Sequence, residues 1–147
     1  MKKTTHILFT IYIFLVIWII LFKLSVSIDQ LPHFRSINLI PFYYPNKTTY
    51  QIREVLDNLI IFIPFGLYLK TLNINSDRTI FLGFLLSISL ELSQYIFGIG
   101  ASDITDLIGN TLGSGVGAVL FAFFGKIFPK KRMSMINGIG AVVEVVG

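Results

Sequence analysis

Three carboxylates, Glu91, Asp103 and Asp106, lie close together in the sequence with two amides, Gln94 and Asn110. Carboxylates can act as general bases or hold a divalent cation, and amides both donate and accept hydrogen bonds. The stretch that holds them, ELSQYIFGIGASDITDLIGN, separates two strongly apolar segments. The surrounding elements must therefore explain why polar groups stand where burial in lipid is costly.

Composition indicates an integral membrane protein. The 147 residues are 54% hydrophobic and 14% charged, whereas soluble domains carry about 25% charged residues. The length leaves room for one small domain and for no soluble catalytic module beside the membrane part. The sequence contains no cysteine, so disulfides and thiolate metal sites are excluded. We expect a multi-pass protein of the cell membrane.

The apolar pattern predicts an all-α, polytopic protein with about four transmembrane helices, because a hydrocarbon core of roughly 30 Å needs about 20 helical residues. The predicted spans cover about residues 7–28, 55–72, 79–99 and 104–128. These spans predict a transmembrane domain at residues 1–132, which includes an outer loop at 29–54, and a short C-terminal tail at 133–147. A secretory signal peptide is the alternative interpretation of the first span, because Ser25 and Ser27 form a small-x-small site after a basic start.

Lysine and arginine counts predict the orientation. The N-terminus, the loop after the second span and the C-terminal stretch together hold eight of these residues, and the opposite side holds four. Short loops rich in lysine and arginine stay in the cytoplasm, so we expect both termini inside and the loop 29–54 outside. This excess of lysine and arginine, together with its attraction to anionic lipid, explains the net charge of +4. The charge therefore does not require a nucleic-acid partner.

Helical geometry predicts a polar cluster that opens to the outside. With a tight turn at residues 100–103, the third and fourth spans should form an antiparallel hairpin. Glu91 would then lie roughly 12 Å, and Asn110 roughly 9 Å, below the outer end, so the two can meet. Because an ionised carboxylate this deep must be paired, hydrated or protonated, Glu91 is the candidate functional residue, with Asn110 and Gln94 as its expected partners. The expected cluster consists of Asn58, Glu91, Gln94, Asp103, Asp106 and Asn110.

Small residues indicate close helix packing. Gly109, Gly113 and Gly117 repeat every four residues, a pattern that lets membrane helices approach closely, inside one chain or in a homodimer. Pro64 and Gly66 lie in the second span, where neighbouring helices can satisfy the freed backbone groups.

The polar residues also have a structural interpretation. Ser102 or Asp103 could cap the fourth span, which is an ordinary helix start. Asp106 in its first turn is favoured by the helix dipole alone. Gln94 and Asn110 could join helices by hydrogen bonds.

Four motifs in order carry a family resemblance: NLIPF at 38–42, DNLIIFIPFG at 57–66, ELSQ at 91–94 and DITDLIGNTLGSGVG at 103–117. This set resembles the VanZ-like membrane proteins over about residues 10–128. The resemblance implies these signature positions: Asn58, Pro64, Gly66, Glu91, Gln94, Asp103, Asp106, Asn110 and Gly113. Many members carry an Arg a few residues before the first Asp, where this chain has Gly98-Ile99-Gly100-Ala101, so the charge state of the aspartates is not carried over.

The resemblance implies an envelope role, because the family takes its name from a protein that lowers susceptibility to teicoplanin. The first hypothesis is a non-enzymatic protein whose outer cluster binds a lipid-linked or lipid-tailed molecule, such as a glycopeptide antibiotic or cell-wall precursor, beside membrane lipid. The alternative is an intramembrane enzyme acting on a lipid headgroup, with Glu91 as base and Asp103 and Asp106 as ligands of a divalent cation. No basic residue on the cluster faces would hold phosphate. A weaker alternative is a proton-coupled carrier that uses Glu91. We expect no cofactor.

Overall fold

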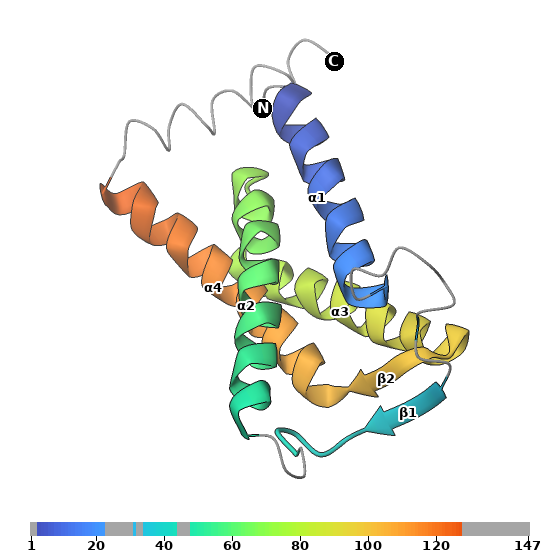
Figure 1. Cartoon of the computed structure of the whole chain (residues 1–147). Coiled ribbons are helices and arrows are strands. Elements are labelled where there is room, and N and C mark those ends of the chain that lie inside the picture. The colour runs from blue at the N-terminus through green and yellow to red at the C-terminus, as the bar shows by residue number, and fades with distance from the viewer. Residues whose placement is uncertain (1–2, 23–30, 32–33, 44–47, 128–147) are drawn as a thin grey trace.

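The computed structural model describes residues 3–22, 31, 34–43 and 48–127 (Figure 1). Its elements, in chain order, are α1 Lys3–Phe22, β1 Phe34–Asn38, α2 Thr48–Thr71, α3 Ser76–Phe97, β2 Ile99–Asp103 and α4 Ile104–Ile127. The described part is therefore mostly helical, as the apolar pattern predicts. The expected tail at 133–147 and the proposed signal-peptide site lie outside the described residues.

Three of the described helices, α1, α3 and α4, are long and apolar enough to cross a membrane. Helix α2 is not among them, because Arg53, Glu54, Asp57 and Lys70 interrupt its apolar sequence. The chain is thus a membrane protein with apolar helices of spanning length, and the count of four spans stays a prediction.

Two helix boundaries differ from the expected spans. Helix α1 ends at Phe22 within the described residues, whereas the expected first span continues to residue 28, in a segment outside them. Helix α2 begins at Thr48, inside the expected outer loop. Pro64 does not break α2, which is continuous from Thr48 to Thr71.

The expected tight turn at residues 100–103 is wrong, because this segment is a strand. Gly98 ends α3 with a left-handed φ of 66°, a conformation that costs glycine little. Strand β2 follows at once and pairs in parallel with β1, in register from Phe34 opposite Ile99 to Asn38 opposite Asp103. The paired strands satisfy each other's backbone groups, which a turn would have to do locally. The all-α expectation therefore misses one two-stranded ribbon.

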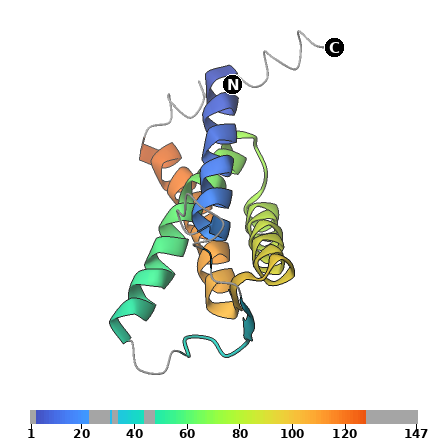
Figure 2. The ribbon, with the colours of Figure 1, turned by 45° about the vertical axis from the view of Figure 1, so that its right-hand side comes forward.

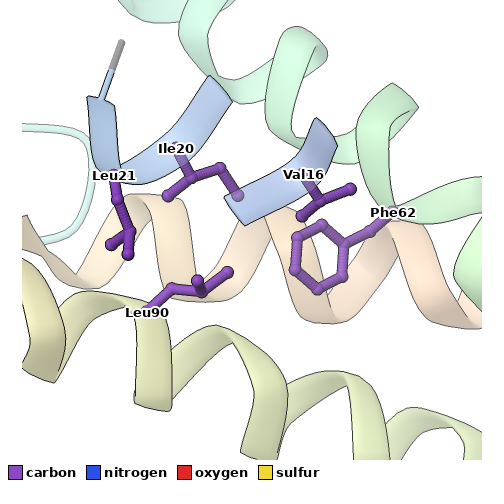
Figure 3. Packing of buried hydrophobic residues seen from close by; sticks show 5 residues of the cluster. All are labelled: Val16, Ile20, Leu21, Phe62 and Leu90. Atoms are coloured by element: carbon purple, nitrogen blue, oxygen red, sulfur yellow. The ribbon is translucent and has the colours of Figure 1, made fainter. Parts of the chain in front are cut away.

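The apolar core lies where α1, α2 and α3 meet. Val16, Ile20 and Leu21 of α1 point toward Phe62 of α2 and Leu90 of α3 (Figure 3). All of these side chains are buried, and Phe62 is completely enclosed. Separating these buried side chains would lose their packing contacts and cost free energy. The cluster therefore holds α1 against α2 and α3.

The glycine face of α4 packs inside the chain. A side chain at Gly113 would meet the backbone carbonyl of Leu59, and one at Gly117 would meet that of Ile63. Gly66 of α2 lies correspondingly close to the backbone of Ser114. Small residues thus let α2 and α4 cross at short range, as the spacing predicts. This face of α4 is thus in contact with α2 of the same chain.

The arrangement of the helices gives the molecule two distinct ends (Figures 1 and 2). The first turn of α1 and the last turns of α2 and α4 lie at one end. The two strands and the first turns of α2 and α4 lie at the other, which we call the strand end. Residues from the outer loop and from the starts of α2 and α4 are therefore brought together at the strand end.

Candidate functional site

Asp103 connects several elements of the strand end by hydrogen bonds. It closes β2 and immediately precedes α4. Its Oδ1 accepts a hydrogen bond from the backbone N–H of Thr105 at 2.7 Å, and its Oδ2 accepts one from Asn38 Nδ2 at 2.9 Å. The bond to Thr105 is the helix cap that the sequence suggests. Asp103 thereby joins β1, β2 and α4.

Glu91 attaches α3 to the same strand. Its Oε2 accepts a hydrogen bond from the backbone N–H of Asp103 at 2.8 Å. Ser102 Oγ donates to the Glu91 backbone carbonyl at 2.6 Å. The Glu91 side chain is only 6% exposed, so this contact offsets part of the cost of burying a carboxylate. Glu91 therefore helps to position β2.

The two buried amides join other helices. Asn110 Nδ2 donates to Ser87 Oγ at 2.9 Å, and Gln94 Nε2 donates to the carbonyl of Ile20 at 2.8 Å. Both side chains therefore link helices, which confirms that interpretation of Gln94 and Asn110. Neither of these two hydrogen bonds involves Glu91, the partner expected from the sequence.

Asn58 and Asp106 form a second contact, between α2 and α4. Asn58 Nδ2 donates to Asp106 Oδ1 at 2.6 Å, and both residues are half-buried. Asp106 lies in the first turn of α4, where the helix dipole favours a negative charge. Close by, Arg53 and Asp57 form an exposed pair with an N–O distance of 3.6 Å. Asp106 is more accessible than Glu91 and Asp103, which are both buried.

The loop after β1 is held against this site by hydrogen bonds. Asn38 Oδ1 accepts from the N–H of Ile40 at 3.2 Å, and Asn38 Nδ2 donates to the carbonyl of Tyr43 at 3.3 Å. The N–H of Phe42 donates to Thr105 Oγ1 at 3.0 Å. Phe42 has a φ of 57°, which is unusual for a bulky residue. Such a conformation persists where surrounding contacts impose it, and it is frequent in functional loops.

The six predicted residues do not form one open cluster. Glu91, Gln94, Asp103 and Asn110 are buried, and only Asn58 and Asp106 are partly accessible. The structure groups Glu91 with Asp103 and Asn58 with Asp106, while Gln94 and Asn110 hold other contacts.

Two contributors were absent from the predicted cluster. Asn38 lies in the NLIPF motif, but only the pairing of β1 with β2 brings it to Asp103. Thr105, two residues after Asp103, accepts the hydrogen bond that holds the loop, and nothing in the sequence distinguishes it from an ordinary threonine near a helix start.

The hydrogen bonds favour a binding or structural role for these carboxylates. Both side-chain oxygens of Asp103 already accept hydrogen bonds, so a cation would have to displace them or share their lone pairs. The described residues contain no group of three or more His, Asp or Glu side chains arranged to hold a metal ion. The weak metal candidates, Asp103 and Asp106, thus lack a third ligand of this kind in the part described.

Comparisons with known proteins support the family resemblance. The model of the VanZ/LLP1 family matches residues 9–125. Protein VanZ of Enterococcus faecium is 40% identical over an alignment of 136 positions, which covers 88% of this chain and 80% of that protein. No solved structure matches the chain.

Proposed function

Because this chain belongs to the VanZ/LLP1 family, we propose that it lowers susceptibility to teicoplanin-type lipoglycopeptides or handles a lipid-linked envelope molecule in the bacterial cell membrane. The observation that carries the proposal is the pair Asn58–Asp106, which leaves a carboxylate partly accessible at the strand end. The contacts of Asp103 and Glu91 hold the elements around this pair.

The proposed topology has four spans, with both termini in the cytoplasm and the strand end outside. In this arrangement helix α2 also crosses the membrane, in addition to α1, α3 and α4. Its 24 residues are long enough, and it packs closely on the glycine face of α4. The start of α1 and the ends of α2 and α4 lie at one end, which is consistent with this topology (Figure 1). The distribution of lysine and arginine supports the orientation.

The site would act by binding. Asp106 and Asn58 are both partly exposed, and their carboxylate and amide groups are of the kinds that hydrogen-bond to the polar part of a ligand. Beside them the loop after β1 exposes apolar side chains, including Leu39, which is 72% exposed, Ile40 and Tyr43. A molecule with a polar head and a lipid tail could contact both surfaces at once. This combination supports a lipid-linked or lipid-tailed ligand.

The enzymatic alternative assigns the role of general base to Glu91. A base must reach a proton on the substrate, but the Glu91 carboxylate is buried and its Oε2 faces the N–H of Asp103. A glutamine at this position would keep an oxygen acceptor for that N–H while losing basicity. We therefore expect Glu91→Gln to retain function if the protein acts by binding.

Drug susceptibility of a Gram-positive host tests the proposal. The host would express the wild type, Glu91→Gln or an empty vector, with membrane levels matched by immunoblotting of a tag. We expect a raised inhibitory concentration of teicoplanin, unchanged for vancomycin, with both proteins. Absence of protection by the wild type at a verified membrane level would contradict the resistance role. Loss of protection in well-folded Glu91→Gln would favour the enzymatic alternative.

A further inference from the structure

Arg35 lies on the ribbon that carries the polar site, although its sequence position assigns it only to the outer loop. It is the second residue of β1 and pairs in register with Gly100. Asn38, on the same strand, holds Asp103. The pairing of β1 with β2 thus brings a permanent positive charge to the strand end, beside the end of α3.

The Arg35 guanidinium is anchored but incompletely used. Its Nη2 donates a hydrogen bond to the carbonyl of Ile96 at 3.1 Å. Among the residues that the structure describes, the Arg35 side chain forms this one hydrogen bond. Its other guanidinium N–H groups therefore remain for a ligand. The contact fixes the side chain close to the end of α3. An arginine fixed in this way loses little freedom when it binds an anion.

A pocket opens beside this guanidinium. Its volume is about 400 Å³, and it is lined by Phe34, Arg35, Phe97 and Gly98. Gly98 leaves space next to the arginine, since a side chain there would lie 3.5 Å from Arg35 Nε. Arg35 is the charged residue in this lining, so the pocket favours an anion.

The surroundings of the pocket match the boundary between lipid headgroups and acyl chains. Phe34, Ile37, Ile96 and Phe97 are all exposed, with Phe97 at 69%. Phe97 also ends α3, a helix apolar enough to cross a membrane. The end of such a helix lies near the headgroups, where apolar side chains can enter the acyl region. A phosphate at this depth is better placed to meet Arg35 than one dissolved in bulk water.

We propose that Arg35 binds the phosphate group of an anionic membrane lipid in this pocket. The guanidinium donates hydrogen bonds to the phosphate oxygens, while Phe34 and Phe97 contact the adjoining glycerol and acyl chains. Apolar neighbours exclude part of the water and lower the local dielectric constant, which strengthens the ion pair relative to one in water. This lipid site does not depend on the proposed resistance function, and its binding is measured without an antibiotic.

Native mass spectrometry of the purified full chain in detergent tests the proposal. The probes are phosphatidylglycerol, phosphatidylcholine and diacylglycerol of the same acyl composition. With the wild type we expect the affinity to fall in that order, because phosphatidylcholine carries a compensating cation and diacylglycerol lacks phosphate. Equal affinity for phosphatidylglycerol and diacylglycerol would overturn the proposal. This comparison requires no variant and is independent of any effect of mutation on folding.

Substitutions then locate the site. Arg35→Gln should weaken phosphatidylglycerol binding roughly fivefold to tenfold, the loss expected for a charge-assisted hydrogen bond. The matched control is Arg53→Gln, which removes the same charge from an exposed position on α2 and should change binding less than about twofold. Equal losses in the two variants would overturn the assignment to Arg35. Displacement of the lipid by millimolar inorganic phosphate would instead identify a site for soluble anions and overturn the lipid as ligand.

Discussion

At the scale of single residues, Asp103 connects the elements of the strand end. Its carboxylate accepts from Asn38 on β1 and from Thr105 on α4, and its N–H donates to Glu91 on α3. A buried carboxylate is tolerated where such donors replace water. Loss of one donor should therefore cost more than loss of an exposed ion pair.

Asn38→Ala provides the residue-scale prediction. It leaves Asp103 Oδ2 without its Asn38 donor, so the free energy of unfolding should fall by about 1–3 kcal/mol. The control Asp57→Asn, at a side chain that is 58% exposed, should change it by less than about 0.5 kcal/mol. Reversible unfolding in mixed micelles measures both. Equal stability of Asn38→Ala and the wild type would contradict the role given to this contact.

The sequence predicted which polar residues belong to the site better than it predicted their hydrogen-bond partners. Glu91 and Gln94 lie three residues apart, a local spacing that places both on one face of a helix. Both residues are buried in the structure. The contact of Asn38 with Asp103 depends on two strands far apart in sequence, which no local spacing reveals. From local spacing, Glu91 was expected to pair with Gln94 of its own helix and Asn110 of the facing helix, whereas its Oε2 accepts a hydrogen bond from the N–H of Asp103 on β2.

At the scale of elements, the packing of α2 on α4 and the ribbon of β1 and β2 organise the site. The spacing of Gly109, Gly113 and Gly117 predicted a tight interface but left its partner open. The structure identifies the partner as α2. The ribbon was not predicted, because residues 99–103 resemble a loop until a distant strand pairs with them.

Glycine substitutions give the element-scale prediction. Gly113→Ala and Gly117→Ala place a methyl group against the backbone of α2, so each should destabilise the protein by about 1–3 kcal/mol. The matched control is Gly115→Ala on the same helix, whose added carbon would lie 3.5 Å from the Ile80 side chain. This ordinary contact, with the better helix propensity of alanine, should leave stability unchanged or slightly raised.

Thermal unfolding in one detergent compares the three glycine variants. The interface between α2 and α4 predicts lower melting temperatures for the variants at 113 and 117 than for the one at 115. Identical melting temperatures would contradict close packing of these helices.

At the scale of the whole molecule, the main question is which side of the membrane the strand end faces. Both ends of the bundle carry exposed residues that can be labelled, and the sequence has no native cysteine. Leu39 is exposed near the strand end, and Asp77 is exposed at the start of α3.

Single-cysteine labelling in intact cells measures this orientation. With the proposed topology, Leu39→Cys reacts with a membrane-impermeant maleimide, whereas Asp77→Cys reacts only after permeabilisation. The expected difference follows from the placement of lysine and arginine toward the cytoplasm. The reverse pattern would place the strand end inside and remove the basis for binding an external ligand.

The central claim, that the partly accessible carboxylate at the strand end supports resistance, is tested most directly by Asp106→Asn. Asparagine keeps an oxygen acceptor for Asn58 but removes the charge. In a host with matched membrane levels, teicoplanin protection should fall to the empty-vector value in Asp106→Asn and persist in Asp57→Asn, with vancomycin susceptibility unchanged. Full protection by folded Asp106→Asn would contradict the claim.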